Sequence, residues 1–133
     1  MRAVLDPNIL IAALLSPAGT PARALSAWLA GEFELIVSEC LLQELERALA
    51  YSKIRRRVDQ QDAAEFVELL RETAQVAADP EGGGSHHSPD PGDDYLLALA
   101  ESERAVLVTG DADLLTLAGA LPVVTARAFV ESL

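Results

Sequence analysis

The stretch that best indicates how this chain folds is Ala105-Val106-Leu107-Val108-Thr109-Gly110-Asp111. Its four leading apolar residues lack polar alternation, which is typical of a strand covered on both faces, as in a parallel sheet. A turn and an acidic residue follow the strand directly. Elsewhere in the chain, short apolar runs predict further strands at residues 3–5, 35–37, 76–77 and 123–124.

Helical patterns separate these runs. Apolar residues at helical spacing predict helices over residues 9–15, 21–29, 39–50, 62–74, 94–103, 112–118 and 126–133. Thr20 and Ser38 precede two of these segments, and we expect each of them to cap its helix. Because strands alternate with helices, the sequence predicts an α/β fold with a parallel sheet between helices, a three-layer α/β/α sandwich.

The length of 133 residues predicts one domain, 1–133, with a single buried core. Half of the residues are hydrophobic and the mean hydropathy is +0.21, which excludes a disordered chain. Residues 79–92, in contrast, are mostly Gly, Ser, Pro and Asp, and they predict a flexible loop within the domain. His86 and His87 lie in this loop with no partner at metal-ligand spacing, so we interpret them as solvent-exposed loop residues.

The charge balance is acidic, with 10 Lys and Arg against 21 Asp and Glu and a formal net charge of −11. This disfavours a non-specific nucleic-acid coat protein, which needs a basic surface, and it suits a basic protein partner. The single cysteine, Cys40, excludes an intrachain disulfide and fits a reducing compartment. Because the apolar runs are too short to span a bilayer, we expect a cytoplasmic protein.

Three acidic residues are expected at one edge of the sheet. Asp6 follows the first strand, Asp111 follows the strand at 105–108, and Asp94 opens the helix that leads into that strand. Right-handed crossovers bring the carboxyl ends of parallel strands to one edge, where ligands bind in folds of this class. Carboxylates gathered there repel one another, and Mg²⁺ or Mn²⁺, which prefer oxygen ligands, would compensate for that repulsion.

Four motifs resemble those of the PIN-domain ribonucleases, in the order found in that family. They are Val4-Leu5-Asp6-Pro7-Asn8-Ile9-Leu10, the segment 38–45 with Glu44, the segment 90–100 with Asp94, and the segment 107–115 with Asp111. The similarity spans nearly the whole chain. The closest branch is formed by the VapC-related toxins of bacterial toxin–antitoxin modules.

This resemblance implies a sheet of four or five parallel strands and a Mg²⁺- or Mn²⁺-dependent ribonuclease that hydrolyses RNA phosphodiester bonds. Carried over by motif, the catalytic acids are Asp6, Glu44, Asp94 and Asp111. Of these acids, Asp6 and Asp94 would bind the metal directly, and Asp111 would bind it directly or through water. Glu44 would position or deprotonate a water molecule or bind a second ion.

Further residues and partners are implied by the same resemblance. Asn8 and Thr109 would be polar groups that support the ligands, with Asp113 as a neighbour of Asp111. The toxin branch also implies a homodimer and a cognate antitoxin protein that binds and inhibits it.

Pro7 departs from the family pattern, which usually has Thr or Ser after the first Asp. Proline removes a hydroxyl and a backbone N–H beside the expected metal site, although it suits the start of the following helix. One alternative is therefore a PIN-fold binding module with impaired catalysis. A second is a Mg²⁺-dependent phosphoacceptor or phosphatase domain. It is disfavoured because the only lysine, Lys53, lies far from the late strands and because Asn8 stands where such a phosphatase needs a second Asp.

Each acidic residue also has a purely structural interpretation. Asp6, Asp94 and Asp111 stand at the starts of predicted helices, so helix capping or the helix dipole can account for them, and capping is compatible with metal binding. Glu44 and Glu46 flank the apolar stripe of residues 39–50 on opposite sides. Helical spacing does not choose between these two, and only the resemblance favours Glu44.

Half of the basic residues gather in one part of the chain, namely Arg47, Lys53, Arg55, Arg56 and Arg57. This cluster could bind RNA phosphates beside the acidic site. It equally suits a solvated helix end, where the helix dipole favours positive charge. The sequence leaves both interpretations open.

Overall fold

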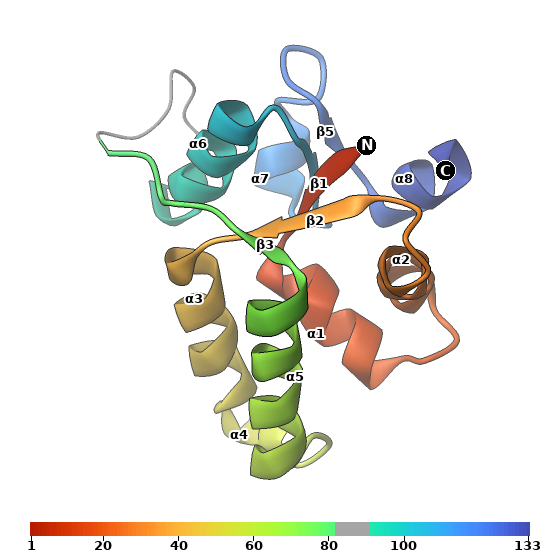
Figure 1. Cartoon of the computed structure of the whole chain (residues 1–133), viewed down its shortest axis with the longest axis vertical. Coiled ribbons are helices and arrows are strands. Elements are labelled where there is room, and N and C mark those ends of the chain that lie inside the picture. The colour runs from red at the N-terminus through yellow and green to blue at the C-terminus, as the bar shows by residue number, and fades with distance from the viewer. Residues whose placement is uncertain (82–90) are drawn as a thin grey trace.

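The computed structural model describes residues 1–81 and 91–133, and its centre is a parallel sheet of five strands (Figure 1). The strands are β1 Arg2–Leu5, β2 Glu34–Val37, β3 Gln75–Val76, β4 Val106–Val108 and β5 Val123–Val124. Their order across the sheet is β3-β2-β1-β4-β5, which places β1 at the centre with β4 beside it. The predicted α/β fold with a parallel sheet is confirmed.

The helices follow the predicted pattern closely. Their bounds are α1 Pro7–Leu15, α2 Thr20–Leu29, α3 Glu39–Leu49, α4 Ser52–Arg55, α5 Gln60–Thr73, α6 Asp94–Glu103, α7 Ala112–Leu115 and α8 Ala126–Ser132. A short 3-10 helix, η1 Pro91–Asp93, leads into α6. The short helix α4 was not predicted, because its four residues carry no apolar periodicity.

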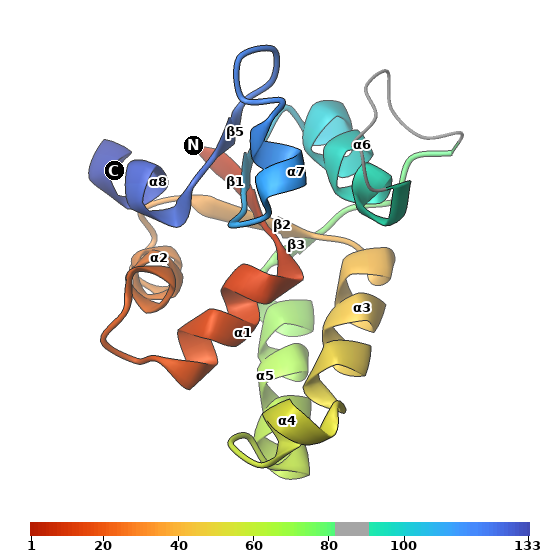
Figure 2. The same cartoon turned by 180° about the vertical axis from the view of Figure 1, so that it is seen from behind.

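Helices lie on both sides of the sheet, as Figures 1 and 2 show. α6 packs against β1 and β4, whereas α1, α3 and α5 pack in a row on the opposite side. α2 packs against α1 and α8. This arrangement is the predicted three-layer sandwich, and it covers most of the sheet from both faces, while the edge strand β3 stays exposed.

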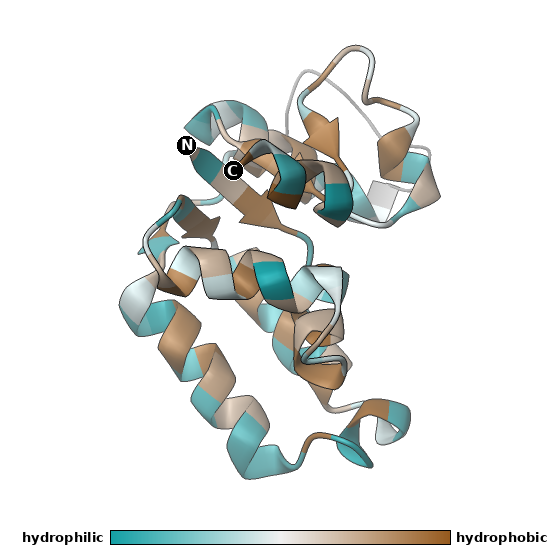
Figure 3. Cartoon of the chain, turned by 90° about the vertical axis from the view of Figure 1, so that its right-hand side faces the viewer, coloured by the Kyte–Doolittle hydropathy of each residue, from teal (hydrophilic) through white to brown (hydrophobic). Residues whose placement is uncertain are grey.

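The core explains why the strand sequences are apolar without alternation. Val4, Ile36 and Val108 are fully buried, and apolar residues follow the strands while the outer helices carry mixed surfaces (Figure 3). Phe33 and Phe129 meet edge to face with 4.8 Å between ring centroids, and this contact fixes α8 beside the start of β2.

Two helices begin two residues earlier than the apolar pattern predicts, because a capping residue precedes each of them. Asp6 is the N-cap of α1, whose first residue is Pro7. The Asp59 carboxylate accepts a hydrogen bond from the Asp62 amide at 2.8 Å and starts α5. Cap residues therefore define these helix starts better than hydrophobic periodicity does.

The two predicted caps have different outcomes. Ser38 caps α3 as expected, with its Oγ accepting a hydrogen bond from the Leu41 amide at 3.3 Å. The prediction for Thr20 is wrong, since Gly19 is the N-cap of α2 and Thr20 is already its first helical residue. Pro21 suits either register, because proline is tolerated throughout the first helical turn.

The predicted loop at 79–92 is described at its two ends. Asp79 contacts the start of α3, and residues Pro91–Asp93 form η1. His86 and His87 lie outside the described residues.

In the part of the chain that the structure describes, no single helix is long and apolar enough to cross a membrane. α1 and α2 meet that test of length and composition only as a pair, across a bend of 100°.

Candidate active site

Asp6 lies at the carboxyl end of the central strand β1 and is only 4% exposed. Its backbone amide extends the ladder of the sheet by donating to the Val108 carbonyl at 2.9 Å. Its Oδ1 accepts a hydrogen bond from the Asn8 amide at 2.9 Å and so caps α1. Pro7 occupies the first helical position, where a missing amide hydrogen costs no helical bond, so this departure from the family pattern preserves the local fold.

A fully buried threonine joins Asp6 to Asp111. The Thr109 hydroxyl donates to Asp6 Oδ2 at 2.7 Å and accepts a hydrogen bond from the Asp111 backbone amide at 3.0 Å. Asp111 caps α7, because its Oδ1 accepts from the Asp113 amide at 2.8 Å. One hydroxyl therefore links the two acids that follow neighbouring strands β1 and β4.

The residues around this pair contribute in different ways. Asn8 and Asp113 donate their backbone amides, and both residues are exposed. Thr109 contributes its side chain, which donates to Asp6. Asp6 and Asp111 therefore both cap a helix, which is the structural role expected for them. Each carboxylate still keeps lone pairs for a further ligand.

Burial raises the pKa of the Asp6 carboxyl above its ordinary value, and the negative charge of Asp111 raises it further. The Asn8 amide and the Thr109 hydroxyl act in the opposite direction, because they stabilise the charged form, but burial prevails. A desolvated carboxylate that faces a second negative charge is a place where a cation lowers the free energy.

Glu44 and Glu46 point to different neighbours of α3. The Tyr95 hydroxyl on α6 donates a hydrogen bond to the Glu44 carboxylate. Glu46 instead pairs with Arg71 on α5, with 3.8 Å between Oε1 and Nη2. The two glutamates therefore face different helices, since Glu44 faces α6 and Glu46 faces α5.

Tyr95 was missed in the sequence because it stands at the start of the apolar run of α6 and resembles a core residue. Burial is the largest cause of the raised pKa of its phenol. The hydrogen bond to Glu44, the charge of Glu44 and the charge of Asp6 raise this pKa further, in that order. Because both carboxylates act on the phenol, Tyr95 lies within electrostatic range of acids on β1 and on α3.

We expect the Tyr95 phenol to stay protonated at a pH where an ordinary tyrosine ionises. Replacing Tyr51, which is 66% exposed, with Phe leaves Tyr95 as the only tyrosine, so tyrosinate absorbance reports on it alone. The folded Tyr51→Phe protein should show no ionisation at a pH of about 10, whereas the same protein in urea should titrate at about that pH. Since the folded state holds this proton more tightly, stability should fall as the pH rises above about 10. A midpoint of about 10 in the folded protein would contradict the environment described.

Asp94 opens α6, directly before Tyr95, and is half-buried in the first helical turn. Across residues 1–81 and 91–133, no three His, Cys, Asp or Glu side chains gather closely enough to hold a metal ion. The structure therefore presents the linked pair of Asp6 and Asp111, without a completed set of three ligands among the described residues.

Asp79 is a neighbour of Cys40 that the sequence did not reveal, since it lies at the start of a turn-rich segment. Its carboxylate accepts a hydrogen bond from the Cys40 backbone amide at 3.0 Å, at the start of α3. Partial desolvation of the thiol, and then the charge of Asp79, raise the pKa of Cys40. Because nucleophilic chemistry needs the thiolate, Cys40 is not an activated nucleophile.

The predicted basic cluster lies mostly away from the acids. α4 sits at the end of α3 that is remote from the sheet (Figures 1 and 2). Arg47 lies in the last turn of α3, and Arg57 Nη2 donates to the Leu15 carbonyl at 2.8 Å, at the end of α1. The remaining members, on α4 and at its C-cap, are Lys53, Arg55 and Arg56.

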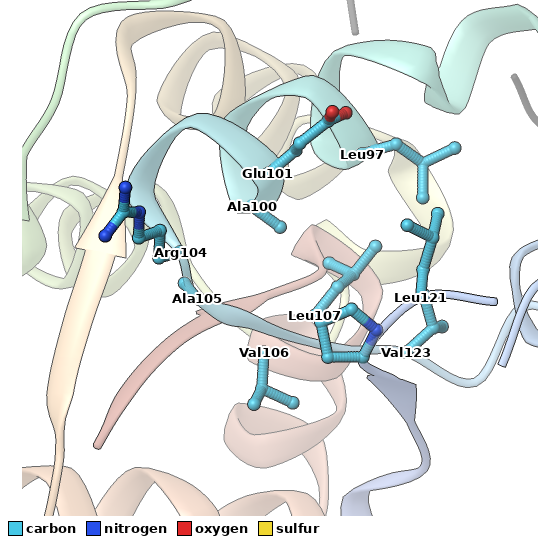
Figure 4. A pocket seen from close by; sticks show the side chains of 10 residues that line it. Leu97, Ala100, Glu101, Arg104, Ala105, Val106, Leu107, Leu121 and Val123 are labelled. Atoms are coloured by element: carbon cyan, nitrogen blue, oxygen red, sulfur yellow. The ribbon is translucent and has the colours of Figure 1, made fainter. Parts of the chain in front are cut away.

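A mostly apolar cavity of about 360 Å³ lies between α6, β4 and β5 (Figure 4). Leu97, Leu107 and Leu121 line it, with the side chains of Glu101 and Arg104 also present. Since β4 begins in this cavity and ends at the acidic pair, the cavity belongs to the opposite edge of the sheet.

These features define a class of α/β protein, in which an all-parallel sheet presents linked acids at the carboxyl ends of its central strands. A family model for the PIN domain matches residues 2–113. The chain belongs to the PIN domain family.

Individual relatives are distant in sequence and similar in fold. An uncharacterized protein of Methanocaldococcus jannaschii is 23% identical over 117 residues, which cover 88% of this chain and 75% of the relative. The structure of VapBC-1 from nontypeable Haemophilus influenzae matches with a TM-score of 0.67 at 21% identity, covering 96% of this chain and 99% of that chain. The structure of VapBC2 from Rickettsia felis, bound to a DNA fragment from its promoter, matches with a TM-score of 0.64 at 16% identity. This match covers 94% of this chain and 97% of that chain. The structure of FitAcB from Neisseria gonorrhoeae matches with a TM-score of 0.61 at 16% identity, covering 94% of this chain and 98% of that chain.

Proposed function

We propose that this chain is a Mg²⁺- or Mn²⁺-dependent endoribonuclease. The observation that carries the proposal is the buried Asp6 carboxylate, linked through Thr109 to Asp111 at the carboxyl edge of the sheet. PIN domains are generally nucleases and generally use a divalent metal. A buried carboxylate linked to a second acid, at the place where this fold binds ligands, suits that activity better than a purely structural role.

The proposed ligands are Asp6, Asp94 and Asp111, which all supply the carboxylate oxygens that Mg²⁺ and Mn²⁺ prefer. Asp6 and Asp111 are already linked through Thr109, and Asp94 would have to join this pair when a cation binds. A bound divalent cation would polarise the scissile phosphate and lower the pKa of a water molecule. The Asn8 amide and the Thr109 hydroxyl fix both oxygens of Asp6 in place. Glu44 is the proposed group that orients the attacking water or accepts its proton.

We further propose that the chain is the toxin of a toxin–antitoxin module and acts in the cytoplasm. The proposal is supported by the similar structures of VapBC-1, VapBC2 and FitAcB, because the VapBC proteins are toxin–antitoxin pairs. The proposed partners of this chain are an antitoxin protein, an RNA substrate and a second copy in a homodimer. A net charge of −11 favours a basic segment in the antitoxin.

Purified protein incubated with a fluorescently labelled RNA tests this function. We expect internal cleavage with Mn²⁺ or Mg²⁺ and none with EDTA, and restoration of cleavage when excess Mn²⁺ follows EDTA. Mn²⁺ should also raise the melting temperature, because an ion that binds the folded chain stabilises it. Absence of cleavage together with an unchanged melting temperature would instead favour the catalytically impaired binding module that Pro7 suggested.

A further inference from the structure

The contact between Tyr95 and Glu44 crosses from one layer of helices to the other. Tyr95 stands in the first turn of α6, which packs on one face of the sheet, and Glu44 stands in the middle of α3 on the opposite side. The two side chains meet by a hydrogen bond from the phenol to the carboxylate, at the edge where Asp6 and Asp111 end their strands.

We propose that Tyr95 is a positioning residue, which holds the Glu44 carboxylate in the orientation that the ribonuclease reaction needs. This inference rests on the proposed function. In this scheme Tyr95 contacts Glu44 and acts on the reaction through that carboxylate.

The need for such a residue follows from the side chain that it holds. A glutamate on a helix surface has three rotatable bonds, and an unheld carboxylate samples many positions. The phenol fixes one carboxylate oxygen of Glu44, and the second oxygen keeps its lone pairs for a water molecule. Glu46, two residues later, is tied to Arg71 on α5 and so belongs to a different face.

The position of Tyr95 also links Glu44 to the proposed ligand Asp94. The two residues are consecutive at the start of α6, so one helical turn carries both a proposed metal ligand and the group that orients the proposed base. A shift of α6 would therefore displace both together. A displacement of about 1 Å in a reacting group can cost about a hundredfold in rate.

Four proteins test the proposal: wild type, Tyr95→Phe, Glu44→Ala, which removes the acceptor of the phenol hydrogen bond, and the double variant. Tyr95→Phe removes the hydroxyl and keeps the ring, and Tyr51→Phe is the matched control, because Tyr51 is the other tyrosine and is 66% exposed. We expect Tyr95→Phe to lower kcat about tenfold with KM unchanged, and Tyr51→Phe to leave both unchanged. In the Glu44→Ala background, Tyr95→Phe should have little further effect on kcat, because the carboxylate that it positions is already lost.

Urea unfolding of the same four proteins supplies a readout that does not depend on RNA. We expect the two single changes to be non-additive in the unfolding midpoint, as for residues in direct contact. Additive midpoints would show that Tyr95 does not hold Glu44 and would overturn the inference, whatever the activity. A non-additive midpoint with kcat unchanged in Tyr95→Phe would also overturn it. So would a loss of kcat on Tyr95→Phe that is as large in the Glu44→Ala background as in the wild type. Failure of the proposed function itself would be visible separately, as absence of metal-dependent cleavage by the wild type.

Discussion

Replacing Asp6 with Asn is expected to lower metal-dependent RNA cleavage by about a hundredfold or more. Metal ions stabilise developing charge by several kcal/mol, and each 1.4 kcal/mol or so corresponds to about a tenfold change in rate. Asn keeps the size of the side chain and an oxygen that can accept the hydrogen bond from the Asn8 amide. The change therefore removes the charge that a cation needs while it preserves the cap of α1.

The stability of the Asp6→Asn variant is expected to change in the opposite direction from its activity. Because burial raises the pKa of Asp6, ionisation of this group disfavours the folded state, and the penalty appears as the pH rises through that pKa. At neutral pH the metal-free variant should melt at a temperature equal to or above that of the metal-free wild type. Mn²⁺ should raise the melting temperature of the wild type and leave that of the variant unchanged.

Circular dichroism and thermal melts with and without Mn²⁺, beside the RNA assay, check both parts. A variant that cleaves RNA at the wild-type rate would rule out Asp6 as a metal ligand. A variant that unfolds at a much lower temperature would show that Asp6 is primarily a structural cap.

Replacing Thr109 with Val is expected to destabilise the fold by about 2 kcal/mol and to reduce cleavage as well. The hydroxyl is fully buried and serves two partners, Asp6 Oδ2 and the Asp111 amide. An unsatisfied buried polar group costs about 1–3 kcal/mol, and Val leaves two such partners without their bond. The same change also releases both acids from their common anchor.

Two matched variants separate these effects. Thr109→Ser keeps the hydroxyl and should retain most of the stability and activity. Thr116→Val removes an exposed hydroxyl that donates to the Asp113 carbonyl, and it should change stability by no more than about 0.5 kcal/mol. Equal unfolding free energies for Thr109→Val and wild type in urea denaturation would show that the hydroxyl bridge contributes nothing.

The fold was largely predictable because four of its five strands are mostly buried, and only the edge strand β3 is exposed. Uninterrupted apolar runs located all five strands, and the residue ranges of β5 and α6 agree with the structure. The starts of α1 and α5 were predicted two residues late, because the capping residues Asp6 and Asp59 are polar and add nothing to an apolar pattern.

The site was predictable to the extent that it depends on backbone topology. Strand ends place Asp6 and Asp111 side by side, and a parallel sheet requires this. The contacts of Glu44 were not predictable, because a helix offers two faces and only the packing against α6 selects one. The remote position of α4 likewise follows from how α3 leaves the sheet, which no local pattern in residues 53–57 encodes.

Anomalous diffraction from crystals soaked in Mn²⁺ tests the proposed metal centre most directly. We predict one strong peak bounded by the carboxylates of Asp6, Asp94 and Asp111, and its loss from crystals of the Asp6→Asn variant. Density that shows Mn²⁺ only at other surface acids, with these three carboxylates unliganded, would contradict the proposed centre.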